Sequence, residues 1–414
     1  MFRYYLLILL LPLAIAPTDA QPETTLMHDP RSEEAIQLMN DFAARTGLTA
    51  DQPPKRYLWT DAFAVCNYLG LARITRRKEY ARLALALVDQ VQHTLGRHRD
   101  DDPRSGWISG SSEHEGERHP TRGGLRIGKT MPERGPDEPF DEHLEWNRDG
   151  QYFHYLTKWM HALDQVTRAT QQSRYNTWAR ELSERAFRSF TYQPSPAWEP
   201  RRMVWKMSID LSRPLVSSMG QHDPLDGYIT DLQLHATADQ LMQAETGPDL
   251  ADQIGSYADM LRHGKWTTAD PLGIGGLLTD AWRLQQLMQQ GVTADAGLHE
   301  KLLDAALTGL QHYTHSGDLQ LPARHRLAFR ELGLAIGLHA VERMQPGNNQ
   351  RSRELLKALK RYRTLRDDIE VFWRDPQHQS TATWTEHQDI NDVMLATSLV
   401  PDGFLAIPSA LGSE

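Results

Sequence analysis

Acidic side chains, histidines and tryptophans recur together at several places along this 414-residue chain. A pair of carboxyl groups can act as a general acid and a base, and a histidine can transfer protons near neutral pH. Aromatic rings can pack on the apolar faces of sugars. The groups are Trp59-Thr60-Asp61, Glu145-Trp146-Asn147-Arg148-Asp149, Gln221-His222-Asp223-Pro224-Leu225-Asp226, Trp266-Thr267-Thr268-Ala269-Asp270-Pro271 and Trp384-Thr385-Glu386-His387-Gln388-Asp389.

The acids of these groups with the most polar neighbours are the candidate catalytic residues. We expect Asp149 and Asp223 to supply the acid and its partner carboxylate, with Asp226 and Glu386 as the next candidates. An aspartate just before a helix also has a structural explanation, because its carboxylate accepts hydrogen bonds from the free N–H groups of the first turn. Helix capping is therefore the alternative role for each of these acids.

Two histidines stand in the same groups, outside the apolar helix faces. His387 is a further candidate catalytic residue, and His222 is a candidate for orienting the substrate, because each has carboxylates close to it in the sequence. Metal binding is the alternative use of a histidine. The sequence shows no His-x-x-x-His or Cys/His spacing typical of zinc, so we expect no metal and no other cofactor.

The tryptophans of these groups precede four of the predicted buried helices, at equivalent positions. Rings placed in this way could hold sugars, although large aromatic side chains also serve as core anchors. Lys206 joins them because the segment Met203–Ile209 reads as a strand near the same end of the fold. The candidate substrate-binding residues are Trp59, Asp61, Trp146, Lys206, His222, Trp266 and Trp384.

Two kinds of helix alternate along the chain. One kind carries a single apolar stripe, which is typical of a helix buried on one side. The other kind is apolar on nearly every side and contains glycines, for which we expect close approach between helices. The half-buried helices are expected near Glu33–Thr46, Lys78–Leu95, Tyr175–Phe190, Leu250–Leu261, Leu298–Tyr313 and Glu354–Trp373. The buried helices are expected near Asp61–Ile74, Asp149–Thr170, Asp223–Ala238, Leu272–Leu287, Phe329–Val341 and Asp389–Leu399.

This alternation predicts an all-α fold, an (α/α)6 toroid of six helical hairpins with an inner and an outer layer. An α-solenoid also alternates helices, but it usually keeps a tighter repeat than this chain shows. The long connections, 96–148, 193–222 and 374–388, all lead from an outer helix to an inner one. They therefore meet at the mouth of the ring where the inner helices begin, and we expect the function there.

The long connections also suggest additional structure at this mouth. The insertion at about 97–148 is rich in arginine and acidic residues, which would suit a solvated loop or a lid that brings arginines to an acidic sugar. Met203–Ile209 is expected to form part of a small β-hairpin there.

The first twenty residues differ from the rest. Arg3 precedes an apolar run from Leu6 to Ala16 that is too short for a comfortable membrane span. The pattern predicts a signal peptide at 1–20, with an uncleaved anchor as the alternative, and a single toroid domain over 21–414 in the periplasm or outside the cell. The net charge of −9 argues against nucleic acid and anionic membranes as partners.

The placement of these motifs resembles the six-hairpin glycosidase-like superfamily, in particular its secreted bacterial members. The segments that carry the resemblance are Arg56-Tyr57-Leu58-Trp59-Thr60-Asp61, Gly220-Gln221-His222-Asp223-Pro224-Leu225-Asp226 and Trp384-Thr385-Glu386-His387. The resemblance implies an active site at the inner-helix mouth, with Asp149 and either Asp223 or Asp226 as a carboxylate pair. Sugar 2-epimerases of this superfamily place a histidine where His387 stands, but they have a histidine and a glutamate where this chain has Asp270-Pro271-Leu272-Gly273.

The expected function is that of a carbohydrate-active enzyme, foremost a glycoside hydrolase with paired carboxylates. The alternatives are a sugar epimerase or lyase that uses His387 and His222, and a glycan-binding protein without catalysis. The expected partner is an oligosaccharide or polysaccharide fragment, with an acidic sugar as one option.

Overall fold

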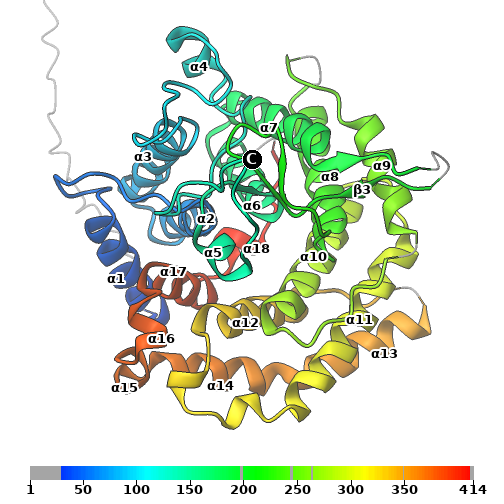
Figure 1. Cartoon of the computed structure of the whole chain (residues 1–414). Coiled ribbons are helices and arrows are strands. Elements are labelled where there is room, and N and C mark those ends of the chain that lie inside the picture. Colours follow the sequence, from blue (N-terminus) through cyan, green and yellow to red (C-terminus); the bar gives the residue numbers. More distant parts are fainter. Residues whose placement is uncertain (1–28, 196–198, 243–245, 263, 348, 411–414) are drawn as a thin grey trace, which may run out of the picture.

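Six helices that are buried on nearly every side form a closed inner ring in the part of the chain that the structure describes. The computed structural model describes residues 29–195, 199–242, 246–262, 264–347 and 349–410, so the predicted signal peptide lies outside the described residues. The inner helices are α2 (Leu58–Thr75), α6 (Phe153–Thr170), α8 (Asp223–Gln240), α10 (Pro271–Gln289), α12 (Ala328–Arg343) and α17 (Gln388–Leu399). Each packs against the next, and α17 packs back against α2. Figure 1 looks along the axis of this ring.

An outer layer of helices surrounds the ring, as the sequence predicts. Their apolar stripes face inward; in α3, for example, Tyr80, Ala84, Leu87 and Val91 are buried. The outer helices are α1 (Pro30–Arg45), α3 (Lys78–Leu95), α7 (Arg174–Phe190), α9 (Ala251–Leu261), α11 (Ala296–His315), α13 (Gln350–Leu359) and α14 (Arg363–Arg374). The (α/α)6 toroid is confirmed.

The last outer element differs from the single helix expected over Glu354–Trp373. A 3-10 turn at Lys360–Tyr362 divides it into α13 and α14. The two halves pack on different neighbours, α13 on α11 and α14 on α12, which a straight helix would not reach equally well. Two further 3-10 turns, Asp318–Gln320 and Ala323–His325, lead from α11 to α12.

Glycines bring α10 and α12 into close contact, which confirms the reason expected for them there. A Cβ atom added at Gly275 would overlap the carbonyl oxygen of Gly333, and one added at Gly337 would overlap the backbone of Gly275. The neighbouring Gly276 differs, because nothing lies within 4 Å of the place where its Cβ would be. Gly276 faces the interior of the ring.

This difference predicts opposite effects of the same substitution at adjacent positions. Gly275→Ala should lower the free energy of unfolding by about 1–3 kcal/mol, because the backbones must move apart. Gly276→Ala should raise it by up to about 1 kcal/mol, since alanine favours a helix and meets no neighbour. Urea unfolding of both variants measures the two effects. Equal changes in the free energy of unfolding of the two variants would contradict the tight contact between α10 and α12.

Short elements cover the mouth of the ring. The insertion after α3 contains α4 (Glu113–Arg118) and α5 (Glu142–Asn147), and α15 (Pro376–Gln379) and α16 (Ala382–Thr385) precede α17. The predicted hairpin is present: β4 (Lys206–Met207) pairs antiparallel with both β1 (Gln151–Tyr152) and β5 (Pro214–Val216). A second ribbon joins β2 (Thr191–Tyr192) to β3 (Arg202–Met203).

A last short helix, α18 (Asp402–Leu405), closes the opposite end of the ring and packs on α2. A Cβ atom at Gly403 would overlap the carbonyl oxygen of Cys66, so glycine permits this close fit. The following residues run across the ring, where Gln286 and Gln290 donate hydrogen bonds to the carbonyls of Leu405 and Ile407. The toroid is therefore closed at this end.

Candidate active site

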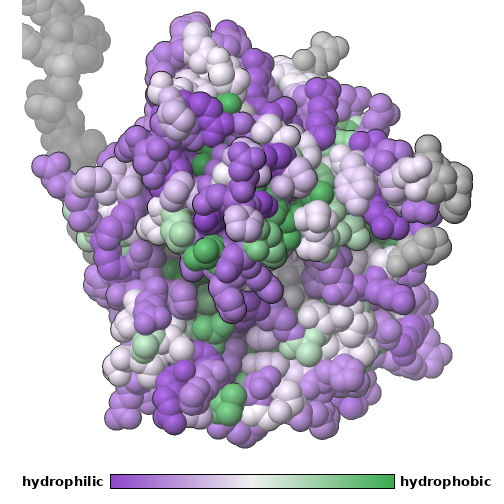
Figure 2. Space-filling view, in the orientation of Figure 1, coloured by the Kyte–Doolittle hydropathy of each residue, from purple (hydrophilic) through white to green (hydrophobic). Residues whose placement is uncertain are grey.

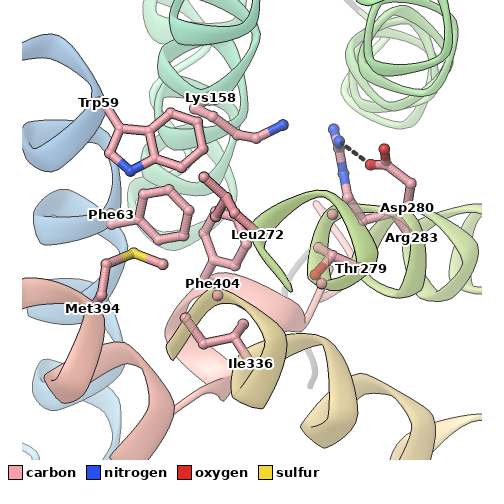
Figure 3. A pocket seen from close by; sticks show the side chains of 13 residues that line it. Trp59, Phe63, Lys158, Leu272, Thr279, Asp280, Arg283, Ile336, Met394 and Phe404 are labelled. Atoms are coloured by element: carbon pink, nitrogen blue, oxygen red, sulfur yellow. Dashed lines mark hydrogen bonds and ion pairs between the residues drawn. The ribbon is translucent and has the colours of Figure 1, made fainter. Parts of the chain in front are cut away.

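The interior of the ring contains a cavity with two chemically different walls. Its empty space is about 410 Å³, including the part that is open to solvent. Apolar side chains from α2, α12, α17 and α18 form one wall, and charged side chains from α6 and α10 form the other (Figure 3). The apolar wall consists of Trp59, Phe63, Ile336, Met394 and Phe404. Figure 2 shows hydrophobic residues toward the middle of the mouth face, within a mostly hydrophilic rim.

The charged side chains of the second wall, Lys158, Asp280 and Arg283, take part in two separate ion pairs. Lys158 of α6 donates a 2.6 Å hydrogen bond to Oδ1 of Asp226 on α8, and Arg283 contacts Asp280 on the same helix α10 at 3.2 Å. In Figure 3 the ammonium of Lys158 points toward Arg283 and Asp280. Arg283 also donates to Gln233 and so connects this wall to the polar interior below. The cavity can therefore offer both donors and acceptors to sugar hydroxyl groups.

Asp223 lies one helical turn before Asp226, at the start of α8. Its Oδ1 is 3.7 Å from Nδ1 of His154. Its Oδ2 is buried, and no hydrogen-bond donor in the described part of the chain reaches it. A side chain that capped the helix would accept such a bond, so capping does not explain this Oδ2.

The protonation states of these two acids differ. Burial, with the nearby charge of Asp226, raises the pKa of Asp223 to about 8, so Asp223 carries its proton at neutral pH. Burial opposes ionisation of Asp226 as well, but the ammonium of Lys158 outweighs it and lowers the Asp226 pKa. Burial lowers the pKa of His154 to about 4, so its ring is neutral. One turn of α8 thus holds a protonated and an ionised carboxyl group.

A third acid, Asp280 of α10, lines the cavity directly. Burial and the charge of Asp226 raise the pKa of Asp280 to about 7.

In the described residues no group of three or more His, Cys, Asp or Glu side chains is arranged to hold a metal ion. None of the described helices combines the length and the apolar character needed to cross a membrane.

Comparison with known proteins finds relatives in structure alone. No sequence-family model and no curated protein sequence matches the chain. A family 76 α-mannanase from Bacteroides thetaiotaomicron superposes with a TM-score of 0.53 at 9% identity, over 91% of this chain and 97% of the mannanase. A family 76 mannosidase from the same organism also gives 0.53 at 9% identity, over 90% and 99%. A sugar epimerase from a ruminal bacterium gives 0.48 at 10% identity, over 89% and 98%.

The chain has the same (α/α)6 toroid fold as these two family 76 proteins. Both family 76 structures span nearly the whole of this chain, so the likeness includes the complete ring. It agrees with the (α/α)6 toroid that the sequence resemblance implies.

Of the predicted site residues Trp59 lines the cavity, Asp226 adjoins it through its bond to Lys158, and Asp223 lies one turn before Asp226. Trp59 lines the apolar wall, and its indole Nε1 is buried without a hydrogen-bond partner in the described structure. His222 is the N-cap residue of α8, directly before Asp223, and its Nε2 lies 2.8 Å from the carbonyl oxygen of Trp266. This contact positions the His222 ring at the mouth.

Asp149 and Lys206 lie in the covering elements, where both are fully engaged. The helix expected from Asp149 begins at Phe153, because Asp149 is used by the insertion. Arg99 and Arg126 contact its carboxylate at 3.3 and 3.0 Å. Lys206 is buried and donates to the side chain of Glu145 at 2.8 Å. These contacts give both residues a structural role, and their part in catalysis or binding stays a prediction.

The arginines of the insertion bind the acids of the insertion and its neighbours. Arg104, for example, forms ion pairs with Asp102, Glu133 and Asp210. Such pairs satisfy the guanidinium group inside the protein. These pairs leave no arginine of the described insertion to favour an acidic sugar, so an acidic substrate stays a prediction.

Two of the predicted tryptophans and Asp61 are buried in the protein. Trp266 and Trp384 are 4% and 2% exposed, and Trp384 packs against Trp373. Asp61 accepts a hydrogen bond from the N–H of Tyr57 and lies 3.4 Å from Arg56. Packing and helix capping account for these three residues, so their contact with substrate stays a prediction.

The remaining predicted residues lie at the rim. Glu386 and His387 are exposed before α17, and the His387 ring contacts Phe329 of α12. Asp270 caps α10 by accepting from the N–H of Gly273, as expected for an aspartate before a proline, and also pairs with Arg330. No described contact joins Glu386 or His387 to the cavity wall.

The sequence interpretation missed Lys158, Asp280, Arg283 and His154. Most of the predicted residues came from motifs around the starts of the inner helices, whereas these four lie within helices and outside those motifs. A usable signal was present. Lysine, arginine and aspartate are rarely buried without partners, so charges inside a helix that is otherwise apolar on every side point to a shared interior site.

Proposed function

We propose that the protein is a glycoside hydrolase in which Asp223 is the general acid and Asp226 the ionised carboxylate. The observation that carries the proposal is the pair itself, two acids one turn apart on α8 whose surroundings favour opposite protonation states. Pairs of titratable groups with separated pKa values are how acid and base roles are divided in such sites. The two-walled cavity beside them suits a sugar ring, which has apolar faces and a polar edge.

In this proposal Asp223 gives its proton to the glycosidic oxygen as the bond to the departing sugar breaks. Asp226, held ionised by Lys158, stabilises the positive charge that develops on the remaining sugar or activates the water that completes hydrolysis. His154 is neutral, and its Nδ1 lies 3.7 Å from Oδ1 of Asp223, where the ring can orient the carboxyl group of the acid. The apolar wall with Trp59 packs on the sugar face.

The test is hydrolysis of a panel of glycans. The structural neighbours are an α-mannanase and a mannosidase, so α-linked mannooligosaccharides come first in the panel, followed by other α- and β-glycans. Release of new reducing ends supports the proposal, and the anomer formed first, read by NMR, gives the stereochemical outcome. Exchange of the C2 proton with deuterated solvent without cleavage would replace it with an epimerase at His387 and His222. Binding without any turnover would replace it with a glycan-binding protein.

The pH dependence follows from the same pair. Since Asp223 must be protonated and its pKa is raised to about 8, kcat/KM should fall as the pH rises through about 8. Because the pKa of Asp226 is lowered, the acid limb should lie below the ordinary aspartate value of about 3.9. A pH–rate profile measures both limbs. A rate that keeps rising above pH 8 would contradict Asp223 as the acid.

The N-terminal segment leads us to propose secretion or export to the periplasm. Cell fractionation, with N-terminal sequencing of the mature protein, tests for cleavage near residue 20.

A further inference from the structure

A continuous series of aromatic rings leads from the exposed surface of the covering elements to the cavity. Trp146 of α5 packs edge-on against Trp205 at 5.2 Å, and Trp205 stacks on His154 at 6.0 Å with an interplanar angle of 12°. His154 contacts Trp59 at 6.2 Å, and Trp59 contacts Phe63 at 5.2 Å. We call these five residues the aromatic track.

The outer end of the track is exposed and firmly held. Trp146 is 47% exposed on a helix of only six residues. Lys206, buried beneath that helix, donates to the carbonyl and the carboxylate of Glu145 and to the carbonyl of Arg148, and Lys129 donates to the carbonyl of Trp146. Burial of a lysine costs free energy. The buried Lys206 and its hydrogen bonds therefore hold the exposed Trp146 in one place at a cost in free energy.

The inner end of the aromatic track is closed by α18. Phe63 stacks on Phe404 of α18 at 4.2 Å, with an interplanar angle of 22°. The carbonyl of Phe404 lies 2.9 Å from Nε2 of His161, which fixes α18 in the ring. A chain that follows the track inward therefore meets a floor and cannot pass through the toroid.

We propose that the site takes a glycan chain by its end, with the terminal sugar in the cavity and the following sugars along the aromatic track. This rests on the proposed function and adds the direction and the length of the substrate. Hydrolysis at Asp223 and Asp226 then adds water across the outermost glycosidic bond within reach and releases a short product from the chain end. A substrate that extends out of the cavity along these rings would reach Trp146, which is exposed and held in place.

The first test measures binding without requiring turnover. Calorimetry with the full-length Asp223→Asn protein and α-linked mannooligosaccharides of two to six sugars should show affinity rising with length. Trp146→Ala in the same background should weaken binding of the longest one about tenfold, the effect of losing one well-placed aromatic contact. Phe140→Ala is the matched control, because Phe140 is an exposed ring on the same insertion that lies over Arg134.

Affinity independent of length, no binding of any length, or equal loss in both ring variants would overturn the track. The second test follows products of the unsubstituted protein from a hexasaccharide labelled at its reducing end. Stepwise shortening supports attack at the chain end, and an early burst of mid-length fragments overturns it. Turnover that survives in Asp223→Asn would remove the proposed acid, while the dependence of binding on length would still report on the track.

Discussion

Asp223→Asn should lower kcat about 100- to 10,000-fold, the contribution expected of a general acid, while leaving the fold intact. The amide has the shape of the protonated carboxyl group that the site favours but cannot give up a proton. The matched control is Asp231→Asn. Asp231 lies on the same helix, is buried, and has its pKa raised by burial to about 7, but it bonds to Ser183 and Gln253 on the outer side of α8. Turnover by the folded control should be unchanged.

The same variant has an expected signature in stability. Because the folded protein holds the proton of Asp223 to about pH 8 and the unfolded chain loses it near pH 4, the stabilising effect of this proton is complete below about pH 4. It falls as pH rises between these values, by at most about 1.4 kcal/mol per pH unit. Asp223→Asn removes this loss, so its stability relative to the unsubstituted protein should increase with pH and level off above about 8. If the difference in stability between the two proteins did not change with pH, Asp223 would not be buried in its protonated form.

Lys158→Met should have a large effect on both stability and turnover. It leaves Asp226 buried without its 2.6 Å partner, and breaking a buried pair on one side costs about 3–5 kcal/mol. The pKa of Asp226 should then rise, so the carboxylate required for catalysis would be protonated at neutral pH. Thermal unfolding and kcat across pH measure the two effects.

A double variant separates the two roles of this ion pair. Lys158→Met with Asp226→Asn removes both charges and should recover most of the lost stability but none of the turnover. Arg168→Met is the comparison, since Arg168 pairs with Asp164 on the same helix at 2.7 Å and lies deeper in the ring. It should lose stability while its folded fraction keeps turnover. Recovery of activity in the double variant would contradict the role of Asp226.

The ring itself could be predicted because the residues within each helix determine the layer to which that helix belongs. Helices with one apolar stripe and helices apolar all round occupy different layers, and both patterns are visible in the sequence. The lengths of the loops also predicted which end of the ring carries the covering elements. Close approach between the buried helices was also expected from their glycines, and the contact of Gly275 with Gly333 is one instance.

The candidate site was predicted in part, because its contacts join residues that are far apart in the chain. Asp223 and Asp226 are candidates from the sequence since they stand together, but Lys158, 68 residues away from Asp226, was not among the predicted residues. Asp149 looked like the start of a helix, whereas the insertion folds back and pairs it with Arg126. The sequence also did not show that Trp384 is buried, because its position beside Trp373 depends on the packing of α14.

The most direct test of the central claim is a crystal structure of Asp223→Asn with a bound α-linked mannooligosaccharide. We expect a terminal sugar ring in the cavity against Trp59, with a glycosidic oxygen within hydrogen-bond distance of the side chain at position 223. We also expect the chain to leave toward Trp146. An oligosaccharide bound outside the ring, or one whose glycosidic oxygens all lie far from residues 223 and 226, would contradict the central claim.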